Sequence, residues 1–388
     1  MREFGPCSFL MPLVKEICQV KEDYLTVVFI SALPWHKVSI SGGGTSLNKQ
    51  WMSVFQVAAV YVGTVIGAGF ATGKEIYEFF TQYGLYGLLG IILAGYIFIR
   101  LGRKMMMIAL KHNLKNYMEF NAWLFGHRLA IFINAIFMIM LIGVTGVMMA
   151  GAGGLFEEQL GFSKMGGMVF TAFLAVVVMS WGIHGLLSIN TFVVPAMVMF
   201  NIILMVISLF TLKGAGHLLN VPDMVSVKAF LSPFSYTAFN LALTQAVLVP
   251  LATEIGDEKL IKRGANLGGI LLALVLLSCH ISLSSVSGIA EINIPTAYVM
   301  KMVAPFLYGL YLFIIFGEIF TSLIGNAFGL ERQLKKVTGL PSWSLYVFVL
   351  SFCLLIGQFD YGPLISYLYP LFGYISLSFL VLLMLKKE

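Results

Sequence analysis

The sequence predicts an all-α integral membrane protein with about ten transmembrane helices. Hydrophobic residues make up 59% of the 388 residues and charged residues only 11%. The mean hydropathy is +0.92, and apolar runs long enough to cross a bilayer recur about ten times. Lysine and arginine gather in alternate loops between these runs, which is the charge pattern of a multi-pass membrane protein.

The composition argues against several other classes of protein. The four cysteines, Cys7, Cys18, Cys279 and Cys353, show no spacing typical of a disulfide framework or a zinc site. The net charge of +6 suits the orientation of membrane helices, so we expect a lipid bilayer as partner and no nucleic acid. The sequence contains no phosphate-binding loop, metal-ligand cluster or nucleophile motif, so we expect neither an enzyme nor a bound cofactor.

Residues 1–50 do not match the rest of the chain. Their one apolar run, residues 24–33, is too short to span a bilayer and lacks a good signal-peptide cleavage pattern. Three glycines at 42–44 stand just before Leu47, as a translated ribosome-binding site before a non-AUG start codon would place them. We therefore expect a non-conforming extension, which is disordered or results from a mis-assigned start at Leu47 or Met52.

Ten apolar runs define the expected spans. A polar, amphipathic stretch at 105–128 separates the second from the third, and a short turn around His184 separates the fourth from the fifth. The spans are expected at residues 53–80, 85–101, 129–153, 167–183, 191–212, 231–255, 265–286, 305–328, 344–357 and 363–385.

The basic residues predict the orientation of these spans. With the N-terminus inside, fifteen lysines and arginines fall on the inner side and five on the outer side. We therefore expect a multi-pass protein of the cell membrane with both termini in the cytoplasm. The outer five are Lys74, Lys164, Lys213, Lys228 and Lys301.

The ten spans divide into two sets of five. The first set is residues 53–212, a loop at 213–230 follows, and the second set is residues 231–388. Because each set contains an odd number of spans, two like-folded sets would be inverted relative to each other. Transporters commonly use such repeats and place their sites where corresponding helices are interrupted.

The first span carries four glycines, at 63, 67, 69 and 73. Each interior glycine weakens a helix by about 1 kcal/mol relative to alanine, so we expect a break at Gly67–Gly69. An unwound turn in lipid persists only where protein or a watery cavity satisfies its peptide groups, so the break indicates a binding site. The alternative is close helix packing through Gly63-x-x-x-Gly67.

The sixth span is the corresponding helix of the second set. It carries Asn240, Thr244 and Gln245 near its centre, and Pro250 frees the carbonyl of Ala246. We therefore expect a second break here. The alternative is that Asn240 and Thr244, four residues apart, form hydrogen bonds across a helix interface.

The stretch from Tyr61 to Glu75, with Gly67-Ala68-Gly69-Phe70-Ala71-Thr72-Gly73, resembles the YkvI-like permeases of the amino acid–polyamine–organocation superfamily. The resemblance covers the chain from about residue 54 to the C-terminus. It implies the LeuT-type fold of 5+5 inverted repeats and a transport activity, and it says more about the fold than about the substrate.

A broken helix offers groups of both signs to a solute. Amides that begin the outer half, at Gly69, Phe70 and Ala71, suit a carboxylate, and carbonyls that end the inner half suit a cation or ammonium group. This pairing favours a small zwitterion such as an amino acid. The expected substrate-binding residues are Gly67, Ala68, Gly69, Phe70, Ala71, Thr72, Phe239, Asn240 and Thr244.

The eighth span places Glu318, Thr321 and Ser322 on one helix face. The resemblance implies that Thr321 and Ser322 contribute hydroxyl oxygens to a sodium ion, with carbonyls of Gly63 and Ile66. The alternative is that these hydroxyls bond to their own helix or join two helices. Glu318 is expected to be the only acidic side chain near the middle of a span, and it is either a sodium ligand, a proton carrier or a structural carboxylate.

These features together predict a secondary transporter for a small amino acid or related zwitterion, working by alternating access with sodium or protons. Two alternatives remain open. A nutrient-sensing receptor subunit related to spore-germination proteins would bind an amino acid without net flux, and a passive channel would conduct without saturation. The sequence leaves the solute, the coupling ion, the direction of transport and the oligomeric state open.

The first prediction concerns the start of the mature chain. Intact-mass analysis of protein from native membranes should find a chain that begins at residue 47, as methionine, or at Met52. A mass that includes residues 1–46 would contradict this prediction.

Overall fold

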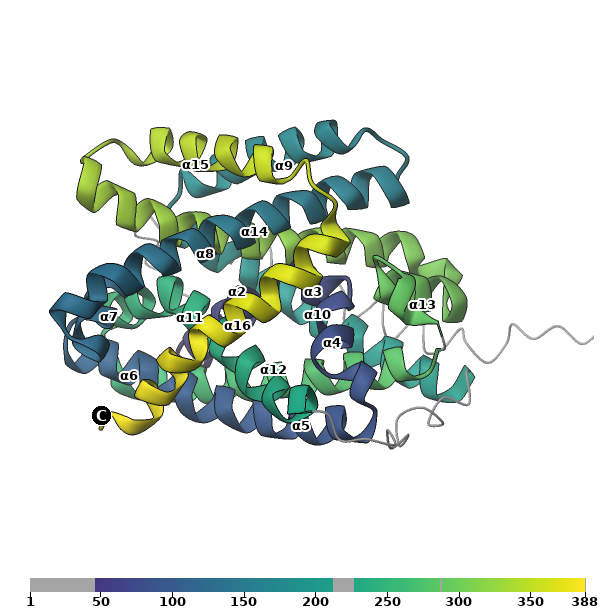
Figure 1. Ribbon diagram of the computed structural model, residues 1–388, viewed down its shortest axis with the longest axis horizontal. Coiled ribbons are helices and arrows are strands. Elements are labelled where there is room, and N and C mark those ends of the chain that lie inside the picture. Colours follow the sequence, from purple (N-terminus) through teal and green to yellow (C-terminus); the bar gives the residue numbers. More distant parts are fainter. Residues whose placement is uncertain (1–45, 212–226, 287, 388) are drawn as a thin grey trace, which may run out of the picture. The chain divides into compact units, whose positions relative to one another are not determined.

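Helices account for nearly all of the described chain in the computed structural model (Figure 1). The structure describes residues 46–211, 227–286 and 288–387, which all belong to one unit, Thr45–Glu388. The predicted extension at 1–50 and the predicted loop at 213–230 therefore lie largely outside the described residues. The first helix, α2, begins at Ser46.

Seven helical segments of the described chain are long and apolar enough to cross a membrane, and three shorter apolar helices accompany them. Each of these segments overlaps one predicted span. Large apolar side chains such as Phe132, Phe173 and Phe348 are exposed on them, as expected where helices face lipid. The long segments are Leu85–Lys111, His127–Gln159, Gly185–Phe210, Val227–Ile255, Glu258–Ser284, Pro305–Thr338 and Tyr361–Leu385, and the short ones are Trp51–Val65, Lys164–Met179 and Ser342–Ile356.

The first half of the described chain contains one interrupted span and four further apolar helices. Its helices are α2 (Ser46–Val65), α3 (Ala68–Ala71), α4 (Lys74–Phe79), α5 (Leu85–Ile97), α6 (Arg103–Lys111), α7 (Tyr117–Phe125), α8 (His127–Gly154), α9 (Lys164–Met179) and α10 (Ile183–Thr211). A π-helical turn, Phe98–Gly102, joins α5 to α6, and another, Leu155–Gln159, extends α8.

The second half contains five apolar helices and one short helix. They are α11 (Val227–Ile255), α12 (Glu258–Ser284), α13 (Pro295–Val303), α14 (Tyr308–Thr338), α15 (Ser342–Ile356) and α16 (Tyr361–Leu385). Several boundaries differ from prediction. The turn before α10 lies at 180–182, where Gly182 adopts a φ of 59°, and α11 includes four residues of the predicted 213–230 loop, 227–230.

The predicted break in the sixth span is wrong, because α11 is one continuous helix through Asn240–Gln245. The polar side chains remain compatible with helix geometry because they bond back to carbonyls one turn earlier, as Asn240 does to Tyr236 and Thr244 to Asn240. Pro250 removes one hydrogen bond from a helix that is otherwise closely packed, and this loss does not interrupt it.

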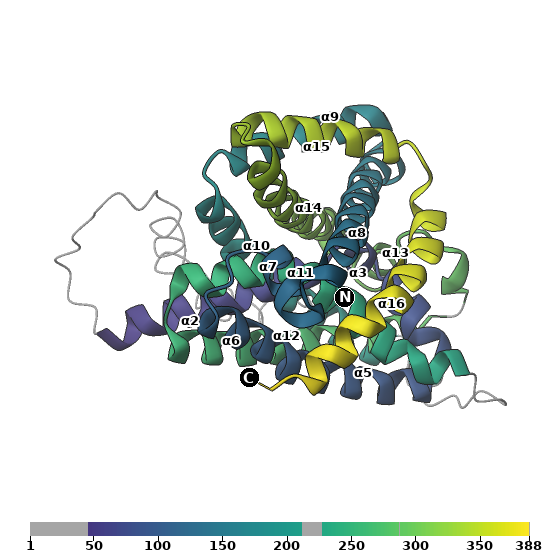
Figure 2. The same ribbon diagram turned by 60° about the vertical axis from the view of Figure 1, so that its left-hand side comes forward.

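The helices form two groups that each combine both halves of the chain. In one group, α11 and α12 each contact α2, α5 and α6, and in the other, α8, α9, α14 and α15 contact one another. Figures 1 and 2 show α9 and α15 side by side, with α8 and α14 running beneath them. Helix α10 contacts α2, α12 and α14, and α16 lies along α11, so these two helices join the groups.

Short polar sequences end and begin the helices outside the apolar spans. Asn116 caps α7 by accepting from the Glu119 amide at 3.0 Å, and Glu119 accepts from the Lys115 amide at 2.8 Å. Lys336 of α14 also reaches Glu119, at 3.0 Å. Partial burial favours a raised pKa for Glu119, but the hydrogen bonds from Lys115, Lys336 and Asn116 outweigh burial and hold the pKa below its usual value.

Two glycines allow α12 to lie directly against α2. Gly264 and Gly268 are four residues apart and face Val57 and Tyr61, which are also four apart. A Cβ at Gly264 would lie 2.6 Å from the Val57 Cβ, and one at Gly268 would lie 2.7 Å from Tyr61 Cδ1. Small residues thus let two backbones approach closely, as is common between membrane helices.

We predict that Gly264→Ala lowers the stability of the detergent-solubilised protein by about 1–3 kcal/mol, because the added methyl overpacks the α2–α12 contact. Gly309→Ala in α14 is the matched control, since a Cβ there meets nothing within 4 Å. Both substitutions replace a helical glycine by alanine, and only the one at Gly264 adds a steric overlap, so the difference in melting temperature reports the packing cost. Equal melting temperatures of the two variants would contradict the prediction.

Candidate functional site

The first span is interrupted at Ile66–Gly67, between the end of α2 at Val65 and the start of α3 at Ala68. Gly67 has an extended backbone, with φ −115° and ψ −169°. The Ala68 amide lies 2.9 Å from Met148 Sδ of α8, and a Cβ at Gly67 would lie 2.6 Å from the Met148 methyl. Gly63 also serves packing, because a Cβ there would overlap the Asn190 side chain of α10. Both interpretations of these glycines, interruption and close packing, therefore apply.

Carbonyls that end α2 are satisfied by α14. The Ser322 hydroxyl lies within hydrogen-bond distance of the Ile66 carbonyl and 3.1 Å from the Gly63 carbonyl. Thr321, by contrast, donates to the Glu318 carbonyl of its own helix at 3.0 Å. The structure thus brings together three oxygens of the predicted sodium site, from Gly63, Ile66 and Ser322.

The end of α3 is held by α13 and α16. Thr296 donates its amide to the Thr72 carbonyl at 3.0 Å and its hydroxyl to the Ala71 carbonyl at 2.8 Å. The Thr72 hydroxyl pairs with Tyr361 of α16 at 2.9 Å. Gly73, at φ +80°, then turns the chain so that α4 can begin, a conformation that favours glycine.

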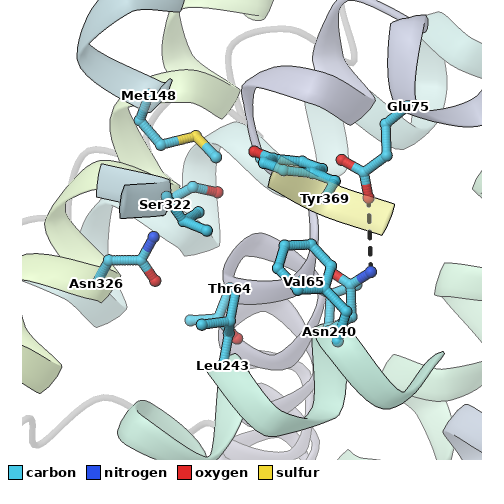
Figure 3. A pocket seen from close by; sticks show the side chains of 12 residues that line it. Thr64, Val65, Glu75, Met148, Asn240, Leu243, Ser322, Asn326 and Tyr369 are labelled. Atoms are coloured by element: carbon cyan, nitrogen blue, oxygen red, sulfur yellow. Dashed lines mark hydrogen bonds between the residues drawn. The ribbon is translucent and has the colours of Figure 1, made fainter. Parts of the chain in front are cut away.

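A small cavity, with about 20 Å³ of space for the centre of a water molecule, lies beside the interruption (Figure 3). It lies where the two helix groups meet, because its walls come from α2, α4 and α11 on one side and α8 and α14 on the other, with α16 adding one residue. Its lining residues are Thr64, Val65, Gly67, Glu75, Val144, Met148, Phe239, Asn240, Leu243, Ser322, Asn326 and Tyr369.

Glu75 supplies the one acidic side chain among the lining residues. It is 2% exposed, and its Oε1 accepts a long contact of 3.5 Å from Asn240 Nδ2, drawn as the dashed line in Figure 3. Its other oxygen lies over Gly69, where a Cβ would come within 2.6 Å of Oε2. Glycine at 69 therefore makes room for the carboxylate.

Aromatic and amide groups complete the wall. The rings of Phe239 and Tyr369 lie 4.8 Å apart, and the Tyr369 hydroxyl is buried with no hydrogen-bond partner in the described chain. Asn326 of α14 faces the cavity from the side opposite Glu75 (Figure 3). The cavity therefore has a carboxylate at one side and hydroxyl and amide groups at the other.

The structure brings four of the predicted site residues to the cavity, namely Gly67, Phe239, Asn240 and Ser322. The others lie outside its lining. The Ala71 amide donates to the Gly67 carbonyl at 2.8 Å, so it differs from the predicted free donor. The remaining predicted residues outside the lining are Gly63, Ile66, Ala68, Gly69, Phe70, Thr72, Thr244, Glu318 and Thr321.

Glu75 was missed as a site residue, because the prediction considered acidic side chains near the middle of a span and Glu75 lies near the end of the predicted span 53–80. Glu75 and Glu318 are both buried. The signal for Glu75 was its place in the motif two residues after Gly73, since a turn there brings the next helix back against the interruption. Asn326 gave a weaker signal, one helical turn beyond Ser322.

The fold and the cavity define a multi-pass membrane protein of the LeuT-type fold. The manganese transporter of Eremococcus coleocola superposes with a TM-score of 0.64 at 14% identity, covering 90% of this chain and 83% of that one. Mhp1, a nucleobase-cation-symport-1 family transporter with bromovinylhydantoin bound, gives 0.59 at 14% identity, covering 81% and 74%. At this identity the likeness concerns the fold.

The sequence relatives identify the family. The membrane protein YkvI of Bacillus subtilis (strain 168), described as uncharacterized, is 44% identical over 338 residues, which are 86% of this chain and 96% of YkvI. YyaD of the same strain is 24% identical over 336 residues, 86% of this chain and 97% of YyaD. No protein-family model matches the chain. The chain belongs to the YkvI family of membrane proteins, which confirms the resemblance seen at Tyr61–Glu75.

We predict that Ser322→Ala lowers stability by about 1–3 kcal/mol in sodium-free buffer, because it leaves carbonyls at the end of α2 without their donor. Thr321→Ala is the control, since its hydroxyl bonds only within α14. Thermal melting in detergent compares the two. A loss in Thr321→Ala as large as that in Ser322→Ala would contradict the assignment.

Proposed function

We propose that this protein is a secondary active transporter that moves a small amino acid or related zwitterion by alternating access, coupled to sodium ions or protons. The observation that carries the proposal is the interruption between α2 and α3, which borders a buried polar cavity at the meeting of two helix groups. Helix interruptions inside a membrane protein are typical of solute and ion sites.

The grouping of the helices supports two five-helix repeats, 53–212 and 231–388. The first and second spans of one half lie with those of the other, as α2 and α5 do with α11 and α12. The third and fourth spans pair in the same way, as α8 and α9 do with α14 and α15. An inverted relation and cytoplasmic termini follow from the odd number of spans per half and the distribution of basic residues.

The coupling site is proposed at the end of α2. Carbonyl oxygens of Gly63 and Ile66 and the Ser322 hydroxyl are hard ligands that suit a sodium ion, and rotation of the Thr321 side chain would add a fourth. Glu318 is 3% exposed and one turn from Ser322 on α14, so it is the proposed carrier if a proton replaces sodium.

The manganese transporter of similar fold suggests a second class of cargo, a divalent metal. The described residues contain no group of three or more His, Cys, Asp or Glu side chains placed to hold a metal ion. The cavity instead offers a single carboxylate among amide, hydroxyl and aromatic groups, which favours a small organic solute.

Transport is tested by counterflow in reconstituted liposomes. Vesicles loaded with an unlabelled mixture of the twenty amino acids should accumulate an external labelled amino acid that stabilises the protein in detergent. Saturable counterflow supports the proposal. Stabilisation without counterflow would instead indicate a nutrient-sensing receptor subunit, and flux without saturation would indicate a channel.

Sodium coupling predicts a sodium-dependent rise in melting temperature that is absent with potassium at equal ionic strength. The rise should disappear in Ser322→Ala and weaken in Thr321→Ala, because both remove a proposed ligand. Thr338→Ala, at the exposed end of α14, should behave as the unsubstituted protein. A shift that depends on pH and is indifferent to sodium would favour proton coupling through Glu318.

A further inference from the structure

Glu75 is a buried carboxylate with no basic partner in the described chain. None of the ion pairs formed by described residues includes it, because the neighbouring Lys74 lies 4.0 Å from Glu78 and donates to the Ala290 carbonyl at 2.6 Å. No lysine, arginine or histidine lines the cavity. An ionised carboxylate removed from water is costly unless a positive charge compensates it.

Several groups surround the carboxylate. Asn240 Nδ2 lies 3.5 Å from Oε1, Gly69 leaves room for Oε2, and the Tyr369 ring also lies beside Gly69. Asn240 is itself fixed by a 3.0 Å bond to the Tyr236 carbonyl. The carboxylate therefore occupies a prepared position, and the remaining access to it is from the cavity.

The opposite wall carries groups that suit a different part of a ligand. Ser322 and Asn326 lie across the cavity from Glu75 (Figure 3). The Tyr369 hydroxyl, which also lines the cavity, is buried and has no hydrogen-bond partner within the described residues. Phe239 and Tyr369 place aromatic rings beside the space. A carboxylate with neighbouring aromatic rings is the common setting for an ammonium group.

We propose that Glu75 binds the positively charged group of the solute, so that the cavity selects ligands with a protonated amine. This inference rests on the proposed function and identifies which charged group of the solute the site recognises. The sequence analysis assigned the ammonium group to carbonyls at the end of α2, and the inference assigns it to a side chain of α4 instead. When Glu75 is ionised beside a bound ammonium group, a solute carboxylate placed next to Gly69 would be repelled.

The test compares ligands that share a carbon skeleton and differ in charge. L-leucine, isoamylamine and 4-methylvalerate form one series, and L-alanine, ethylamine and propionate form a second. Each is titrated against the full chain in detergent at pH 7, with the melting temperature as the measure of binding. The amino acid or amine of at least one series should stabilise the protein, and neither carboxylate should.

Glu75→Gln removes the charge and keeps the shape of the side chain. It should weaken binding of the amine-bearing probes about 30-fold or more, as expected when one partner of a buried charge pair is lost. The matched control is Glu78→Gln, one turn later on α4, because Glu78 bonds Ser366 at 3.0 Å and lies outside the cavity lining. It should leave binding unchanged.

Glu75→Asp keeps the negative charge but shortens the side chain by one methylene group. It replaces Glu75→Gln as the test variant if Glu75→Gln does not fold. It should retain the preference for amines with weaker affinity. Amine affinity that is unchanged in the Glu75 variants overturns the inference, as does stabilisation by the carboxylates alone or by none of the probes.

The same proteins separate this inference from the proposed transport. Binding that depends on Glu75 without counterflow would leave the amine site in place and remove the transport function. Counterflow that is unchanged in Glu75→Gln would support the transport function and contradict the amine site at Glu75.

Discussion

The satisfaction of peptide groups at Ile66–Gly67 is the constraint on which the rest of the structure depends. A helix that stops inside a membrane must find partners for the amides and carbonyls it releases. Here Ser322 covers the end of α2, Met148 lies at the start of α3, and Thr296 covers its end. These partners come from α14, α8 and α13, so the interruption fixes which helices must surround it, and the cavity forms among them.

The two expected interruptions had different outcomes for a physical reason. Gly67 and Gly69 act locally, because each lowers helix propensity whatever surrounds it, and such an effect can be predicted from sequence. The polar residues of α11 can bond to a ligand, to a neighbouring helix or to their own backbone. Asn240 and Thr244 bond to their own backbone, which leaves α11 intact, and only the three-dimensional packing decides this.

The residues of the cavity wall likewise include some that could be predicted from the sequence and others that depend on the three-dimensional packing. Ser322 could be placed because helical spacing and the family resemblance both located it, and the structure sets it against the end of α2. Glu75 could not be placed by spacing along a helix, because the turn at Gly73 changes the direction of the chain between the interruption and the carboxylate. Tyr369 reaches the cavity from α16, far along the sequence, and no local pattern connects it to Gly67. The contacts between distant segments that complete the cavity wall could therefore not be predicted from the sequence.

The glycine contacts between α2 and α12 have a consequence for motion. They bring the backbones of α2 and α12 into close contact, so relative movement of the two helices would have to separate this packing. Beyond the interruption, α3 and α4 are tied instead to α13 and α16 through Thr296 and Tyr361. Helix α4 also contacts α11 and α12, so both parts of the first span pack against these two helices. Ile66 and Gly67 lie between the two helical parts, and torsion about these residues is where the angle between the parts could change.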